Sequence, residues 1–159
     1  MHQADVGHAS DALAFAAQGM PVEPLRLADA YARYHATIPR GQPVLSAIAT
    51  DGAVVLSCNA GKFDHPIKNV LRYEDAISND ASAERHKTLL GTHLKLAHEG
   101  ELPIRLVIVT PPKGPLPRTI GVRPDLTGKV TTFDGDHFVV DFSRPLVEVV
   151  PRARLRRKR

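Results

Sequence analysis

The sequence predicts an α+β domain with a mixed, mainly antiparallel sheet and a layer of helices. Two Asp-Gly pairs, Asp51-Gly52 and Asp134-Gly135, each separate two β-branched, apolar runs, which is typical of tight β-hairpins. A helical segment over 80–98 lies between these hairpins, so the order of elements does not alternate regularly between strand and helix. Antiparallel hairpins combined with a separate helical layer indicate α+β rather than a doubly wound sheet.

Two helices are expected before the first strand. The alanine-rich segment 11–18 has high helix propensity and ends before Gly19 and Pro21. The segment 25–37 carries apolar residues at three- and four-residue spacing and ends before Pro39. Residues 1–40 therefore form a predicted helical N-terminal segment.

The predicted strands lie within residues 43–150, the sheet-containing core. Each is a short apolar run bounded by turn residues. Asp80 is expected to cap the helix over 80–98, and Gly100 to end it. The proline-rich segment 111–115 is expected to be a stiff loop. The expected strands are 44–50, 53–58, 104–109, 130–133, 137–142 and 146–150.

The charge is concentrated at the C-terminus. Residues 152–159 hold six basic residues and no acidic one, which leaves 15 basic against 17 acidic residues in the rest of the chain. The high isoelectric point thus belongs to this tail, and not to the predicted single domain over 1–151. Such an asymmetry is typical of a tail that contacts a polyanion such as nucleic acid.

The single cysteine, Cys58, cannot form an internal disulfide, which indicates a reducing compartment and hence a cytoplasmic location. Because Cys58 lies within an apolar run, it is expected to be a small buried hydrophobic residue. The N-terminus shows no signal-peptide pattern, and no apolar run approaches about 18 residues. We therefore expect no membrane partner.

The densest polar segment runs from 59 to 73 and is expected to be a loop that leaves the strand ending near Cys58. Cations there can hold phosphates, amides can bind base edges, and aromatic rings can stack on bases. The cations are Lys62, Lys68 and Arg72, the amides are Asn59 and Asn69, and the rings are Phe63 and Tyr73.

Common cofactor and metal motifs are missing. Gly61-Lys62 lacks the preceding glycine and the following Ser or Thr of a phosphate-binding loop, and no dinucleotide-binding fingerprint occurs. His86, His93 and His98 do not have the spacing of helical metal ligands; His93 is expected at a packing edge and the other two in solvent. We expect no cofactor, no metal site and no assigned catalytic residue.

The leading interpretation is a nucleic-acid-binding module, with DNA favoured over RNA. The segment 59–73 would supply selectivity, while the tail and the cations Lys113, Arg118, Arg123 and Lys129 would supply phosphate affinity. The predicted binding residues are Lys62, Lys68, Asn69, Arg72, Tyr73, Arg152, Arg154, Arg156, Arg157, Lys158 and Arg159.

Two other interpretations stay open. A small hydrolase or nuclease could use the segment 58–75, where a thiol lies near Asp64 and His65 in the sequence. A protein-interaction subunit could dock a partner on the apolar faces of the two N-terminal helices. Those faces would include Leu13, Phe15, Leu27 and Tyr31.

Overall fold

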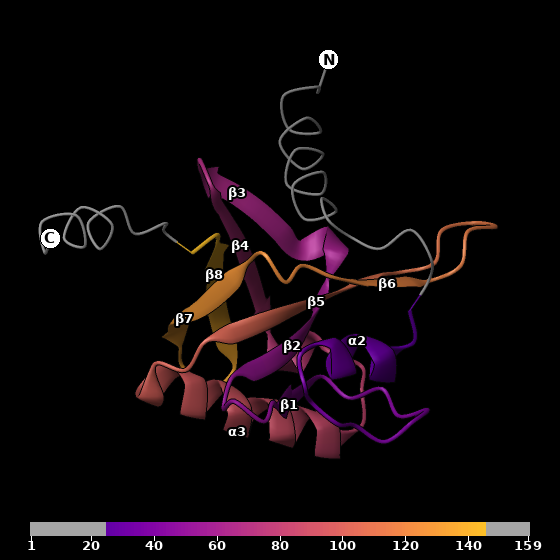
Figure 1. Cartoon of the computed structure of the whole chain (residues 1–159), viewed down its shortest axis with the longest axis horizontal. Coiled ribbons are helices and arrows are strands. Elements are labelled where there is room, and N and C mark those ends of the chain that lie inside the picture. The colour runs from indigo at the N-terminus through magenta and orange to yellow at the C-terminus, as the bar shows by residue number, and fades with distance from the viewer. Residues whose placement is uncertain (1–24, 146–159) are drawn as a thin grey trace, which may run out of the picture.

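The computed structural model describes residues 25–145, and a single eight-stranded sheet forms its centre (Figure 1). Seven strands follow the order β1-β2-β5-β7-β8-β4-β3, and β6 pairs with β5 off this path. Only β2 and β5 are parallel, so the predicted mixed, mainly antiparallel α+β architecture is confirmed. The strands are β1 (Ser46–Ile48), β2 (Val54–Asn59), β3 (Phe63–Ile67), β4 (Val70–Ala76), β5 (Ile104–Thr110), β6 (Thr119–Val122), β7 (Thr127–Phe133) and β8 (His137–Ser143).

The strands β2 and β5 are buried on both faces because each face of the sheet carries a helix. One core contains Leu56 and Leu106 and packs against α3 (Glu84–Gly100). The other core contains Val55 and Val107 and packs against α2 (Leu27–Arg33). Burial on both faces explains why these strands are continuous apolar runs in the sequence, without the alternation of a half-exposed strand.

Helix α2 is part of the domain and does not offer a free docking face. It is shorter than the predicted 25–37, since the chain leaves the helix at Tyr34 and His35 has a positive φ. Ala30 and Tyr31 are fully buried against the sheet, and the Tyr31 hydroxyl lies 2.6 Å from Ser57 Oγ. The expectation that Tyr31 could meet a protein partner is therefore wrong.

The chain reverses at both Asp-Gly pairs, but the turn type differs from the type I′ turn that these dipeptides predict. Type I′ needs positive φ at two residues, and in each turn only the glycine has it, at +89° for Gly52 and +104° for Gly135. At the first turn, Gly52 N–H donates to Ala49 O and Ala49 N–H donates to Ala53 O, within the five residues that separate β1 from β2. Asp134 Oδ1 accepts the N–H groups of Asp136 and His137 at the second.

The polar segment 59–73 is a hairpin, which corrects the predicted loop. After the short helix η1 (Ala60–Lys62), strands β3 and β4 pair across Lys68 and Asn69, and Asn69 has the left-handed φ of +69°. Phe63 and Tyr73 face one another in the register and are both buried. Pro66 is compatible with β3 because β3 is an edge strand.

Helix α3 and strand β6 also differ from expectation. The N-cap of α3 is Ala83 and not Asp80, which instead accepts the N–H of Ser82 through Oδ1. His86 is buried rather than exposed. Strand β6 was not predicted, because its four residues lie between two proline-containing segments. The expected helix over 11–18, the expected strand over 146–150 and the tail 152–159 lie outside the described residues.

Candidate anion-binding cleft

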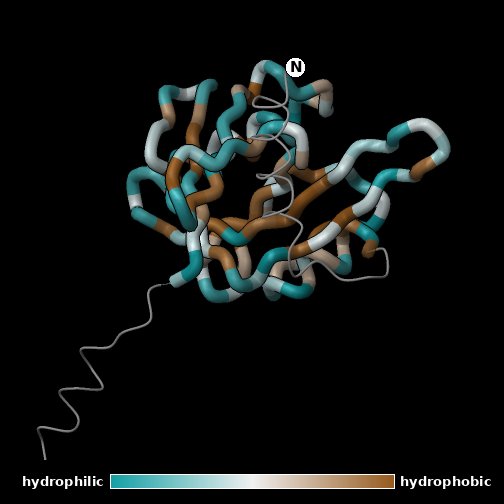
Figure 2. The backbone as a smooth tube through the Cα atoms, turned by 90° about the horizontal axis from the view of Figure 1, so that it is seen from above, coloured by the Kyte–Doolittle hydropathy of each residue, from teal (hydrophilic) through white to brown (hydrophobic). Residues whose placement is uncertain are grey.

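Two adjoining cavities lie where β2 ends, next to the start of α2 and the start of β6. We call the first, of about 320 Å³, the polar cavity, and the second, of about 630 Å³, the arginine cavity. Leu27, Pro43 and Arg118 line both, so the two cavities adjoin, and we call them together the cleft. Hydropathy along the backbone shows apolar strand segments beneath a rim of polar connections (Figure 2).

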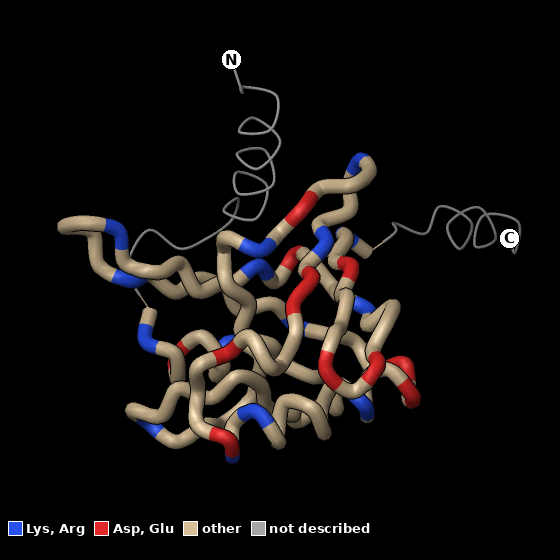
Figure 3. Tube along the Cα trace, turned by 180° about the vertical axis from the view of Figure 1, so that it is seen from behind, with Lys and Arg blue, Asp and Glu red and all other residues tan. Residues whose placement is uncertain are grey.

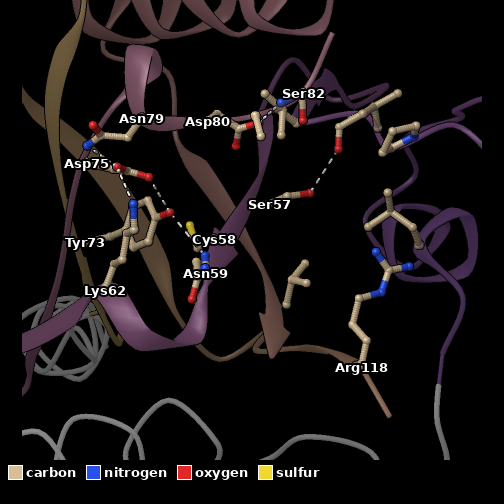
Figure 4. A pocket seen from close by; sticks show the side chains of 16 residues that line it. Ser57, Cys58, Asn59, Lys62, Tyr73, Asp75, Asn79, Asp80, Ser82 and Arg118 are labelled. Atoms are coloured by element: carbon tan, nitrogen blue, oxygen red, sulfur yellow. Dashed lines mark hydrogen bonds and ion pairs between the residues drawn. The ribbon is translucent and has the colours of Figure 1, made fainter. Parts of the chain in front are cut away.

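The polar cavity is built at the carboxyl end of β2, whose last residues switch from apolar to polar. Ser57 and Asn59 come from β2, Asp75 from β4, and Asp80 and Ser82 from the segment that follows η2 (Ile77–Asn79). Figure 4 shows Asp75 among its partners on one side of the cavity and Arg118 on the opposite side. Ends of strands on a rigid sheet are a common place for binding groups.

Asp75 is the centre of a hydrogen-bond network. Its Oδ1 accepts from Lys62 Nζ at 2.9 Å, from Asn79 Nδ2 at 3.2 Å and from its neighbour's N–H at 2.8 Å. Burial raises the pKa of this carboxyl, but the Lys62 ammonium and these hydrogen bonds outweigh burial and hold the pKa below its usual value. Asp75 is therefore an anion, and its contacts fix Lys62 in place.

Tyr73 and Cys58 are structural parts of the cavity wall. The Tyr73 hydroxyl accepts the N–H of Asn59 at 3.1 Å and donates to Asp75 Oδ2 at 3.1 Å, while its ring packs on Phe63 with centroids 5.1 Å apart. Burial strongly raises the pKa of the Cys58 thiol, and the nearby Asp75 carboxylate adds to this effect. The prediction that Cys58 is a buried hydrophobic residue is confirmed, and such a thiol is a poor nucleophile.

Asp80 differs from Asp75 because half of its carboxylate has no protein donor. Its Oδ1 accepts the N–H of Ser82 at 2.7 Å. Its Oδ2 has no hydrogen-bond partner within the described residues 25–145. The cavity thus offers an anionic acceptor to a ligand.

The arginine cavity is lined by Arg26, Arg40 and Arg118, and no carboxylate lines it within residues 25–145. All three arginines are exposed. Across residues 25–145 none of them has an ion-pair partner. Three unpaired guanidinium groups around one cavity are suited to phosphate, since each can donate two parallel hydrogen bonds to it.

The predicted binding residues within the described part of the chain do not lie together in the structure. Lys62 lines the polar cavity, but it is paired with Asp75. Arg72 forms a bidentate pair with Asp141 on β8, at 2.7 and 2.9 Å. Tyr73 is 3% exposed, so its ring is not available to stack on a base, and the same holds for Phe63. Lys68 and Asn69 lie exposed at the tip of the β3–β4 hairpin.

The four further cations that the sequence suggested lie in three different environments. Arg118 lines both cavities, Lys113 is exposed on the loop between β5 and β6, and Lys129 is exposed on β7. Arg123 is fully buried and bidentate to Asp125, at 2.7 and 2.6 Å, so its expected role in phosphate binding is wrong. The six cations of the tail lie outside the described residues.

Sequence reasoning missed Arg26 and Arg40. Arg26 immediately precedes α2, and Arg40 lies in the turn-like run Pro39-Arg40-Gly41-Gln42-Pro43. Neither has a spacing relation to Arg118. Packing of α2 against β6 brings Arg26 near Arg118, and Arg40 lines the same cavity from the loop that follows α2. No signal in the sequence links them.

None of the histidines within residues 25–145 lines the cleft. His93 Nδ1 lies 2.7 Å from Ser46 Oγ within the core, and burial lowers the pKa of His93. Within residues 25–145, no group of three or more His, Cys, Asp or Glu side chains is arranged to hold a metal ion.

Comparison of the chain with protein-family models, curated proteins and solved structures finds no match. No helix in the described part of the chain combines the length and apolar character needed to cross a membrane. The chemistry of the cleft is therefore the basis for the functional argument.

Proposed function

We propose that this protein is a nucleic-acid-binding module and that the arginine cavity holds the phosphate backbone of DNA. The observation that carries the proposal is the set of three exposed arginines, Arg26, Arg40 and Arg118, around one cavity whose lining within residues 25–145 has no carboxylate. Phosphate contacts from arginine dominate nucleic-acid affinity and position the ligand.

A polymer suits the site better than a single phosphate. Further exposed cations lie on the two segments that project from the sheet, Lys113 on the β5–β6 loop and Lys68 on the β3–β4 hairpin. Figure 3 shows blue Lys and Arg positions on both projections. The tail 152–159 adds six positive charges to the same chain. Phosphates repeated along a strand can meet several of these groups, whereas one small anion cannot.

Within the segment 59–73, Lys68 keeps its proposed role in phosphate binding, whereas Lys62, Arg72 and Tyr73 do not. Lys62 and Arg72 already have carboxylate partners, so they stabilise the cleft and the β4–β8 pairing. The cleft arginines take the positioning role, and the tail supplies affinity without sequence preference.

The test is the salt dependence of binding, measured by fluorescence anisotropy with labelled duplex DNA, single-stranded DNA and RNA. The cleft variant combines Arg26→Gln, Arg40→Gln and Arg118→Gln. If each arginine contacts one phosphate, the slope of log K against log salt should become shallower by about 2 to 3 for the triple variant. DNA should bind more tightly than RNA.

The matched control removes the same charge from helix α3, through Arg85→Gln, Lys87→Gln and Lys95→Gln. None of these three lines the cleft. The control should change the slope far less than the cleft variant does. A chain that ends at Pro151 should bind more weakly but should keep its preference among the three ligands. Equal losses in the cleft and α3 variants would contradict the proposal.

A further inference from the structure

The two cavities of the cleft have complementary chemistry. The arginine cavity offers three guanidinium groups, whereas the polar cavity offers the carboxylates of Asp75 and Asp80. Arg118 lies at the junction and lines both. A nucleotide carries the matching groups, since its phosphate is anionic and its base can present N–H donors.

We propose that the polar cavity holds one unpaired nucleobase with an exocyclic amino group, cytosine in the first instance, while its phosphate lies against Arg118. This inference rests on the proposed nucleic-acid binding and names the group that gives the cleft its selectivity. A base must leave its stack to enter such a cavity, so the ligand is single-stranded or locally unpaired.

Size and shape agree with a single base. A cavity of about 320 Å³ lies at the small end of the range for sites that hold one small ligand, roughly 300 to 1,000 Å³. Leu27, Val44, Leu45 and Val109 contribute apolar side chains to the lining, which suits the faces of an aromatic ring. Figure 4 shows Asp75 beside Lys62 and Asn79, Asp80 next to Ser82, and Arg118 across the cavity from Asp75.

The carboxylates select an amino group over a carbonyl group. Asp80 Oδ2 has no donor within residues 25–145 and lies on a half-buried side chain. An ionised carboxylate only accepts hydrogen bonds. It can accept from the N4 amino group of cytosine, which is a known pairing of Asp and Glu with bases. Uracil and thymine place a carbonyl oxygen at this position, and two acceptors facing each other repel.

The experiment uses the full chain with labelled oligodeoxycytidine and oligodeoxyuridine of equal length. These probes share the ring size and the backbone. Position 4 is amino in cytosine and oxo in uracil, and N3 is an acceptor in cytosine and a donor in uracil. We expect cytosine to bind about tenfold more tightly, the scale of one good base contact. The readout is the ratio of the two affinities, so nonspecific contributions from the tail cancel.

The diagnostic variant is Asp80→Asn. Its side-chain oxygen can still accept from Ser82 N–H, so the local turn is kept, and its amide can donate to the uracil carbonyl. The ratio of affinities should fall close to one. Glu99→Gln on α3 removes the same charge outside the cleft and should keep the full ratio.

The outcomes separate this inference from the function on which it rests. If neither oligonucleotide binds, the proposed function itself is overturned. If both bind with equal affinity to the unchanged chain, nucleic-acid binding stands and the base-selective cavity is overturned. If cytosine is preferred but Asp80→Asn keeps the ratio, the base lies elsewhere and the inference is likewise overturned.

Discussion

Arg118 and Arg123 flank the same four-residue strand, β6, and have opposite environments. Arg123 is fully buried, and its guanidinium is bidentate to Asp125. Arg118 is exposed, has no ion-pair partner among residues 25–145 and lines both cavities of the cleft. Burial without a partner would cost Arg123 several kcal/mol, on the order estimated for isolated ions.

The two arginines are examples of two kinds of positive side chain in this protein. Positive side chains at Arg123, Arg72 and Lys62 have carboxylate partners, so they stabilise the fold. The arginines around the arginine cavity have no ion-pair partner within residues 25–145, and we propose that they bind an external anion. Whether an arginine or lysine stabilises the fold therefore depends on whether it has a carboxylate partner, and not on its residue type.

Removal of the Asp125 carboxylate should have the largest effect on stability. Asp125→Ala leaves the buried Arg123 guanidinium without its bidentate partner and should lower the free energy of unfolding by about 3 to 5 kcal/mol. Asp141→Ala breaks the pair with Arg72, whose side chain is 39% exposed, and should cost about 1 kcal/mol or less. Urea unfolding measures both, and equal losses would contradict the distinction between the two pairs.

A smaller effect should come from His93, which is a second interior group satisfied within the protein. Burial lowers its pKa below the ordinary value of 6.5, so the folded protein favours the neutral ring. Its contribution is therefore complete above about pH 6.5 and is lost as the pH falls toward the lowered value. Urea midpoints should consequently decrease between about pH 8 and about pH 5.

Two matched variants test whether His93 causes this pH dependence of stability. His93→Gln should remove part of it, because Gln does not titrate and can still hydrogen-bond Ser46 Oγ. His98→Gln, on the exposed face of α3, should leave it in place. An unchanged pH dependence in His93→Gln would show that other groups cause it.

The central part of the fold could be predicted because its signals are local. Apolar runs identify β2 and β5, and hydrophobic spacing identifies α3. The β3–β4 hairpin was not predicted because lysines, asparagines and Pro66 make this segment polar overall. Phe63, Leu71 and Tyr73 are nevertheless buried in it. An edge strand needs few apolar residues, so a polar sequence there does not exclude a strand.

The site was harder to predict because its residues come from distant parts of the chain. Arg26, Arg40 and Arg118 line one cavity through packing of α2 on β6 and through the loop that follows α2, which no sequence spacing records. Lys62 and Arg72 were predicted to bind nucleic acid. The sequence does not show that Lys62 pairs with Asp75 and Arg72 with Asp141. A sequence shows which residues are charged, but only the fold shows which of them form ion pairs.

The most direct test of the account is a nuclear magnetic resonance titration of the full chain with single-stranded oligodeoxycytidine. Side-chain and backbone N–H signals of Arg26, Arg40 and Arg118 should shift together with those of Asp80 and Ser82, and signals from α3 should stay in place. This result would locate the ligand in the cleft. Shifts confined to residues 152–159, or centred on α3, would contradict the claim that the cleft binds nucleic acid.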